Sequence, residues 1–167
     1  MNDAKKKVLN AVLVIMGILG YAVLVLPWFN LSSSASFGGY TASFDGGDMM
    51  GFTAAGTSVF GYVLYLLPAA AIALASKVDD VKVPPKSKGL LLELLGVVGC
   101  VCMFLLLSNM DSYGTSYSGY GGSASAGYEP LIGFYAGMAV YIGYAVVGIL
   151  IMMIAPKAPP ADQQANN

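Results

Sequence analysis

The sequence predicts an all-α membrane protein, a bundle of four transmembrane helices with both termini in the cytoplasm. Three observations lead to this fold class. Of the 167 residues, 57% are hydrophobic and only 10% are charged, whereas a soluble domain needs a far more charged surface. Four apolar runs each supply the ~20 helical residues that cross a ~30 Å hydrocarbon core. All basic residues lie in segments that four crossings would place on one side.

The apolar runs divide the chain into nine segments. We expect a cytoplasmic N-terminus over residues 1–7, helices over 8–29, 56–76, 89–109 and 130–155, outer loops over 30–55 and 110–129, a cytoplasmic loop over 77–88, and a disordered cytoplasmic tail over 156–167. A transmembrane barrel is not expected, because no two-residue alternation runs through the apolar segments.

The lysines fix the expected orientation. The eight basic residues are Lys5, Lys6, Lys7, Lys77, Lys82, Lys86, Lys88 and Lys157. All of them fall at the termini or between the second and third runs. Cytoplasmic segments of membrane proteins are enriched in Lys and Arg. We therefore place these three segments in the cytoplasm, and the protein in the cell membrane.

The first run could also be a cleaved signal peptide, since three lysines precede it and the small residues "SSSAS" follow it. Its apolar core of about twenty residues exceeds the usual ~7–15, and Pro27-Trp28-Phe29 separates it from the small residues. We therefore favour an uncleaved helix. In that case Trp28 anchors the helix in the aromatic belt at the outer interface.

The first outer loop contains "SASFGGYTASF". The Gly38-Gly39 pair suits a two-residue hairpin turn, because both positions can take positive φ without a Cβ clash. Phe37 and Tyr40 would then form an aromatic cross-strand pair beside the turn. We expect a small β-hairpin here, with an irregular loop as the alternative.

The second outer loop, "SYGTSYSGYGGSASAGYEP", consists mainly of glycine, serine and tyrosine. Such composition is typical of flexible spacers, but Tyr/Ser/Gly mixtures also make adaptable binding surfaces. We favour a binding surface that the two outer loops form together. Its expected partner-binding residues are Phe37, Tyr40, Tyr113, Tyr117, Tyr120 and Tyr128.

The sequence offers little for catalysis, and we expect neither enzyme activity nor a metal or cofactor. There is no histidine, which excludes histidine-based chemistry within this chain. Cys100 and Cys102 would point in nearly opposite directions on a helix. Asp45 and Asp48 could contact a calcium ion, but two carboxylates fall short of six to eight oxygen ligands. Glu93 is an intramembrane acid, either functional or snorkelling toward the cytoplasmic surface.

Small residues recur at intervals of four in the last apolar run. Gly133 and Gly137 form one such pair, and Ala139 and Gly143 form another. Small residues on one stripe allow helix backbones to approach closely in a membrane. We expect them to pack helices within the bundle, or alternatively between subunits. Pro68 should free the carbonyl of Leu64 and kink the second helix.

The layout resembles small bacterial four-helix (tetraspan) membrane proteins with "Pro-Trp-Phe" (here 27–29) at the outer end of the first helix and a glycine-striped last helix. It is also similar, in topology, to claudin-like proteins, which have a longer first outer loop able to form β-structure and a shorter second one. This resemblance implies outer loops that contact neighbouring proteins.

The expected function is therefore non-catalytic. We expect a structural or interaction protein, or an accessory subunit, that uses its outer loops for self-assembly or for binding another membrane or envelope protein. The alternative is a small transporter or channel component. Such a pathway usually places polar groups near the bilayer centre, where this chain has mainly tyrosines. The lipid bilayer is the other expected partner, and no nucleic acid is expected.

Overall fold

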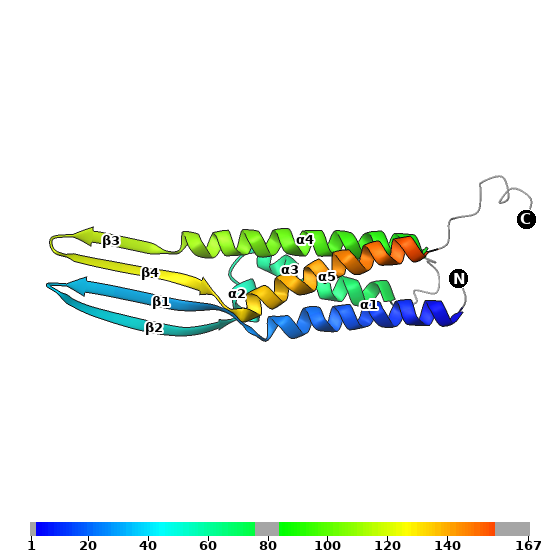
Figure 1. Ribbon diagram of the computed structural model, residues 1–167, viewed down its shortest axis with the longest axis horizontal. Coiled ribbons are helices and arrows are strands. Elements are labelled where there is room, and N and C mark those ends of the chain that lie inside the picture. Colours follow the sequence, from blue (N-terminus) through cyan, green and yellow to red (C-terminus); the bar gives the residue numbers. More distant parts are fainter. Residues whose placement is uncertain (1–2, 76–83, 156–167) are drawn as a thin grey trace, which may run out of the picture.

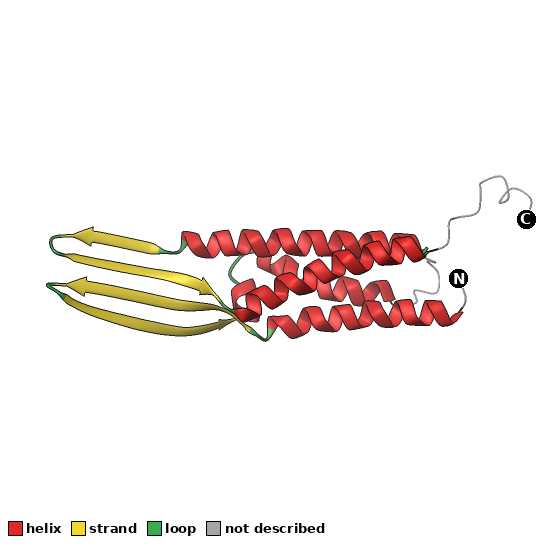
Figure 2. Cartoon of the chain, in the orientation of Figure 1, coloured by secondary structure: helices red, strands yellow, loops and turns green. Residues whose placement is uncertain are grey.

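The fold is mixed α/β, so the prediction of an all-α protein is wrong. A computed structural model describes residues 3–75 and 84–155. In this part of the chain it has five helices and a four-stranded antiparallel sheet. The helices gather at one end of the molecule, and the sheet forms the other end (Figure 2). The regions expected to be two outer loops supply the four strands.

Four helices lie side by side along the long axis (Figure 1). They are α1 (Asp3–Leu24), α3 (Val59–Ala75), α4 (Pro85–Ser112) and α5 (Ile132–Ile154), and the short α2 (Gly51–Ala55) leads into α3. In the described part of the chain, three helices are long and apolar enough to cross a membrane, namely α1, α4 and α5. The apolar helix α3 is shorter, with 17 residues.

Four of the predicted segments extend beyond the described residues, the second apolar run by residue 76 alone. Much of the cytoplasmic loop, with Lys77 and Lys82, lies outside them. The same holds for residues 1–2 and for the tail over 156–167 with Lys157. A fourth crossing over residues 56–76 stays a prediction, as does the placement of both termini in the cytoplasm.

The sheet joins the two segments of the chain that were expected to form outer loops, here called the outer segments. The first segment forms β1 (Pro27–Phe37) and β2 (Tyr40–Met50), and the second forms β3 (Thr115–Gly119) and β4 (Gly122–Pro130). The strand order is β2-β1-β4-β3, so β1 pairs with its own hairpin partner and with β4. At about 3.3 Å per residue, the eleven-residue strand β1 spans roughly 35 Å. The sheet projects along the axis of the bundle (Figure 1).

Two tight turns close the hairpins at the far tip. The hairpin predicted at Gly38-Gly39 is present, with φ of 58° and 86°, and Phe37 pairs with Tyr40. It is not small, because each of its strands has eleven residues. The second turn has positive φ at Tyr120 (39°) and Gly121 (79°). Positive φ is unusual for a residue that is not glycine, and the sequence did not indicate this turn.

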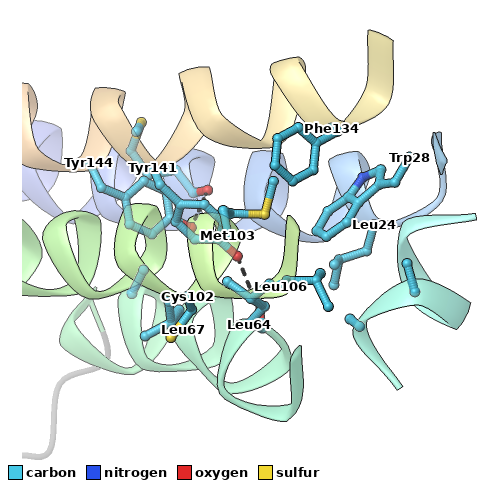
Figure 3. Close-up of a cluster of buried hydrophobic side chains, with 14 of the residues drawn as sticks. Leu24, Trp28, Leu64, Leu67, Cys102, Met103, Leu106, Phe134, Tyr141 and Tyr144 are labelled. Carbon is cyan, nitrogen blue, oxygen red and sulfur yellow. Dashed lines mark hydrogen bonds between the residues drawn. The ribbon is translucent and has the colours of Figure 1, made fainter. Parts of the chain in front are cut away.

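The hydrophobic core runs from the middle of the bundle to the base of the sheet. Tyr141 and Tyr144 of α5 are fully buried among the helices. Trp28, at the start of β1, packs edge-on against Phe134 of α5 (Figure 3). Phe29 packs against the same ring. The aromatic contacts at the junction therefore hold the sheet to the helices.

Candidate interaction surface

The strand register divides the sheet into two chemically different faces, because residues directly opposite each other share a face and successive residues alternate. We call one face the aromatic–alanine face. It contains Ser33, Ala35 and Phe37 of β1 and the residues that the register places opposite them on the other strands. Its members beyond the rows nearest the helices are Ser33, Ala35, Phe37, Tyr40, Ala42, Phe44, Thr115, Tyr117, Ala124 and Ala126.

Large and small side chains are distributed unevenly on the aromatic–alanine face. In the two rows through Ser33 and Ala35, the edge strands carry Phe44 and Tyr117, whereas the central strands carry small residues such as Ala35 and Ala124. The result is a hollow of about 600 Å³ whose lining includes all four residues. Phe44 is 68% exposed and Tyr117 is 70% exposed. The face therefore presents an apolar floor between two accessible aromatic rings.

The opposite face, here called the hydroxyl face, carries two transverse rows of hydroxyl side chains. The register places Ser43, Ser34, Ser125 and Ser116 in one row, and Thr41, Ser36, Ser123 and Ser118 in the next. The Ser34 and Ser125 hydroxyl oxygens lie 3.0 Å apart, and those of Ser36 and Ser123 lie 3.4 Å apart. These contacts cross from the first outer segment of the chain to the second.

Acidic residues lie at the base of the hydroxyl face. The side-chain amide of Asn30 donates to Asp45 Oδ1 at 2.9 Å and to Asp48 Oδ1 at 3.1 Å. The Asn30 amide, together with the backbone N–H of Gly47, holds the pKa of Asp45 below its ordinary value. Both carboxylates are thus engaged by one amide. Among the described residues, no three His, Cys, Asp or Glu side chains meet in a way that could hold a metal ion.

Among the described residues, no other element covers either face of the half of the sheet farthest from the helices. The two turns, all of β3 and most of β2 are exposed, and β4 is exposed in part. A sheet in a soluble domain normally buries at least one face against a helix or a second sheet. An exposed aromatic surface of this kind is typical of a site that binds another molecule.

The six predicted partner-binding residues do not lie on one surface. Tyr117, Phe37 and Tyr40 share the aromatic–alanine face. Tyr113 caps the end of α4, and Tyr120 lies in the second turn, where it is fully exposed. Tyr128 pairs with Leu31 near the base, half-buried against the core.

Trp28 occupies an interior position between the bundle and the sheet. Its side chain is 0% exposed, its indole N–H donates to the carbonyl of Val23 at 2.8 Å, and its ring meets Phe134 edge-on. It therefore anchors β1 to the helices and does not face lipid. Pro27 explains why the helix does not continue, because the residue before a proline is disfavoured in a helix. Accordingly, α1 ends at Leu24.

The small residues predicted to pack helices lie in different environments. Gly133 and Gly137 are buried. A Cβ on Gly133 would meet the carbonyl of Pro27, and one on Gly137 would lie 2.9 Å from Met103 Cε. Gly143 is half-buried, and Ala139 is exposed. Only part of the predicted stripe therefore lies inside the bundle.

Buried hydroxyls within the bundle are used for backbone contacts. Tyr141 donates to the carbonyl of Leu64 at 3.2 Å, and Tyr144 donates to the carbonyl of Met16 at 2.8 Å. These tyrosines tie α5 to α3 and α1. Their hydroxyls have partners, which disfavours a polar pathway lined by them.

The other residues singled out within the apolar runs lie on α4. Glu93 is half-buried, Cys102 is buried and Cys100 is half-buried.

Comparison with known proteins finds no match for this chain among protein-family models, curated proteins or solved structures.

Several residues of the surface were missed in the sequence, although a signal was present. Serine recurs at every second position at 32, 34 and 36, and again at 123 and 125. That two-residue period is typical of a strand with one polar face. Ala35 and Ala124, on the other face, alternate with these serines, and Phe44 follows Ser43 in the same way. The pairing of the two hairpins has no such local signal.

Proposed function

We propose that this chain is a non-catalytic, multi-pass protein of the cell membrane whose outer sheet binds a protein partner. The partner is a second copy of the chain or another membrane or envelope protein. The observation that carries the proposal is the uncovered aromatic–alanine face, held away from the bundle on a four-stranded sheet. The position of the lysines supports an outer location for this sheet.

The chemistry of the face suits protein recognition. Protein interfaces take most of their binding energy from a few aromatic anchors near the centre, surrounded by weaker contacts. Phe44 and Tyr117 flank the alanine floor as such anchors would, and Phe37 and Tyr40 extend the surface to the tip. Fully burying one large apolar side chain contributes about 1.5–3 kcal/mol.

The sheet also holds these side chains in place before binding. The hydrogen-bonded register fixes the backbone of both hairpins, and the Trp28–Phe134 contact fixes the base. A surface that is ordered before binding loses less conformational entropy on association.

The proposal is tested by removing the two flanking rings. The double variant Phe44→Ser with Tyr117→Ser should reduce cross-linked complex, or recovery of any co-purifying protein, at least tenfold, since ~1.4 kcal/mol corresponds to tenfold in affinity. Membrane insertion should not change. The matched control is Ser43→Ala with Ser118→Ala, which alters the same two strands on the hydroxyl face. Equal recovery from the two double variants and the wild type would refute the proposal.

A further inference from the structure

An apolar groove lies between α1 and α5 at the end of the bundle away from the sheet. Its volume is about 610 Å³, within the ~300–1,000 Å³ range of small-molecule sites. Val8 and Val12 of α1 form one wall, and Val147, Leu150 and Ile154 of α5 form the other.

The groove exists because α5 stays against α4 at this end. A Cβ on Gly148 of α5 would lie 2.6 Å from the carbonyl oxygen of Gly89 and 2.5 Å from the backbone nitrogen of Glu93, so the α4 and α5 backbones are in close contact. The hydrogen bond from Tyr144 to the carbonyl of Met16 joins α5 to α1. The residues of α1 that line the groove all lie closer to the start of that helix than Met16.

One cation belongs to the lining of the groove. Lys5 is its charged residue, and the described lining includes no carboxylate. Lys6 and Lys7 follow it on α1. Lys88 of α4 also reaches α1, since its Nζ donates to Asn10 Oδ1 at 3.2 Å. The groove therefore combines apolar walls with a positively charged end.

We propose that this groove binds one anionic phospholipid, with an acyl chain along the valine and leucine walls and the headgroup phosphate at Lys5. Both α1 and α5 have membrane-spanning length and composition, so hydrocarbon chains surround the groove when the protein is inserted. Basic pockets between transmembrane helices on the cytoplasmic side are suited to anionic headgroups. The proposal depends on the membrane placement proposed above and is independent of what the sheet binds.

Filling the groove tests the acyl-chain part of the site. Val147→Trp should lower the number of phosphatidylglycerol molecules retained in native mass spectrometry by roughly tenfold, because the indole displaces several methylene contacts. The matched control is Val146→Trp, because Val146 is 50% exposed and lies outside the groove lining. Equal retention by the two variants would overturn the proposal.

Changing one lysine tests the headgroup part. Lys5→Gln should reduce the preference for phosphatidylglycerol over phosphatidylcholine by about fivefold, as expected for one lysine near an anionic surface. Lys7→Gln removes the same charge outside the lining and should keep most of the preference. An unchanged preference in Lys5→Gln, or equal losses in both variants, would contradict the assignment.

Photo-cross-linking of the wild-type chain gives a test that does not depend on a variant folding. In nanodiscs, phosphatidylglycerol with a diazirine in its acyl chain should label residues 8–12 and 147–154 more strongly than the exposed α4 positions Val97 and Val101. Uniform labelling of all lipid-facing residues would refute a specific site. A chain that stays out of the membrane fraction would instead refute the membrane placement. If the sheet variants lose partner recovery but still retain lipid, this result does not contradict the proposal for the groove.

Discussion

At the scale of single residues, Tyr141 compensates for a hydrogen bond that Pro68 removes from α3. Proline has no N–H, so the carbonyl four residues earlier, at Leu64, lacks its usual helical donor. The Tyr141 hydroxyl donates to that carbonyl from α5 (Figure 3). Within a bilayer, water is not available to replace such a bond. The sequence indicated the free carbonyl but not which side chain would meet it.

Tyr141→Phe should therefore lower the free energy of unfolding by about 1–2 kcal/mol, because it leaves a buried carbonyl without a donor. Reversible unfolding in detergent or bicelles measures the difference. Tyr135→Phe is the control, since Tyr135 lies on the same helix with 56% of its side chain exposed. Equal stabilities for the two variants would show that the Tyr141 hydroxyl contributes nothing.

At the scale of elements, the contact between α4 and α5 depends on Gly148. The three atoms nearest to its hypothetical Cβ are all backbone atoms of α4, including the Glu93 nitrogen at 2.5 Å and the Gly89 oxygen at 2.6 Å. Backbone atoms cannot move aside as the end of a side chain can. Gly148→Ala must therefore separate the helices, and we expect a loss of about 1–3 kcal/mol in stability.

Gly143→Ala provides the comparison. A Cβ there would lie 3.4 Å from Met16 Cε, the end of a flexible side chain, and the variant should unfold at nearly the wild-type temperature. Thermal unfolding of both variants in the same detergent separates the two cases. A Gly148→Ala protein as stable as Gly143→Ala would contradict the close contact.

The elements also show which features the sequence could predict. The apolar runs at the positions of α1, α4 and α5 are unambiguous by length, and Gly38-Gly39 specifies its own turn. The remaining strands, β3 and β4, were missed because glycine and alanine, which are frequent in β4, are depleted in strands. The pairing of Ser34 with Ser125, 91 residues apart in the chain, is a tertiary contact that no local pattern encodes. Without that pairing, the two faces and the hollow between Phe44 and Tyr117 could not be predicted.

At the scale of the whole molecule, the sheet and the helix ends bearing the lysines should lie on opposite sides of the membrane. Single cysteines at Ser118 in β3 and at Ala4 in α1 test this, in a chain whose native cysteines are replaced by alanine. A membrane-impermeant thiol reagent should label Ser118→Cys in intact cells, and Ala4→Cys only after lysis. Labelling of both positions from outside would refute the orientation.

The two outer segments of the chain form one sheet with two different faces. A disulfide between Ser34→Cys and Ser125→Cys tests it most directly, because the native hydroxyl oxygens lie 3.0 Å apart and disulfides require Cβ atoms about 3.5–4.5 Å apart. With Cys100 and Cys102 replaced by alanine, this pair should oxidise almost completely within single chains. The pair Ser34→Cys with Ala124→Cys, whose side chains belong to opposite faces, should remain reduced. Equal oxidation of the two pairs, or none in the first, would contradict the sheet.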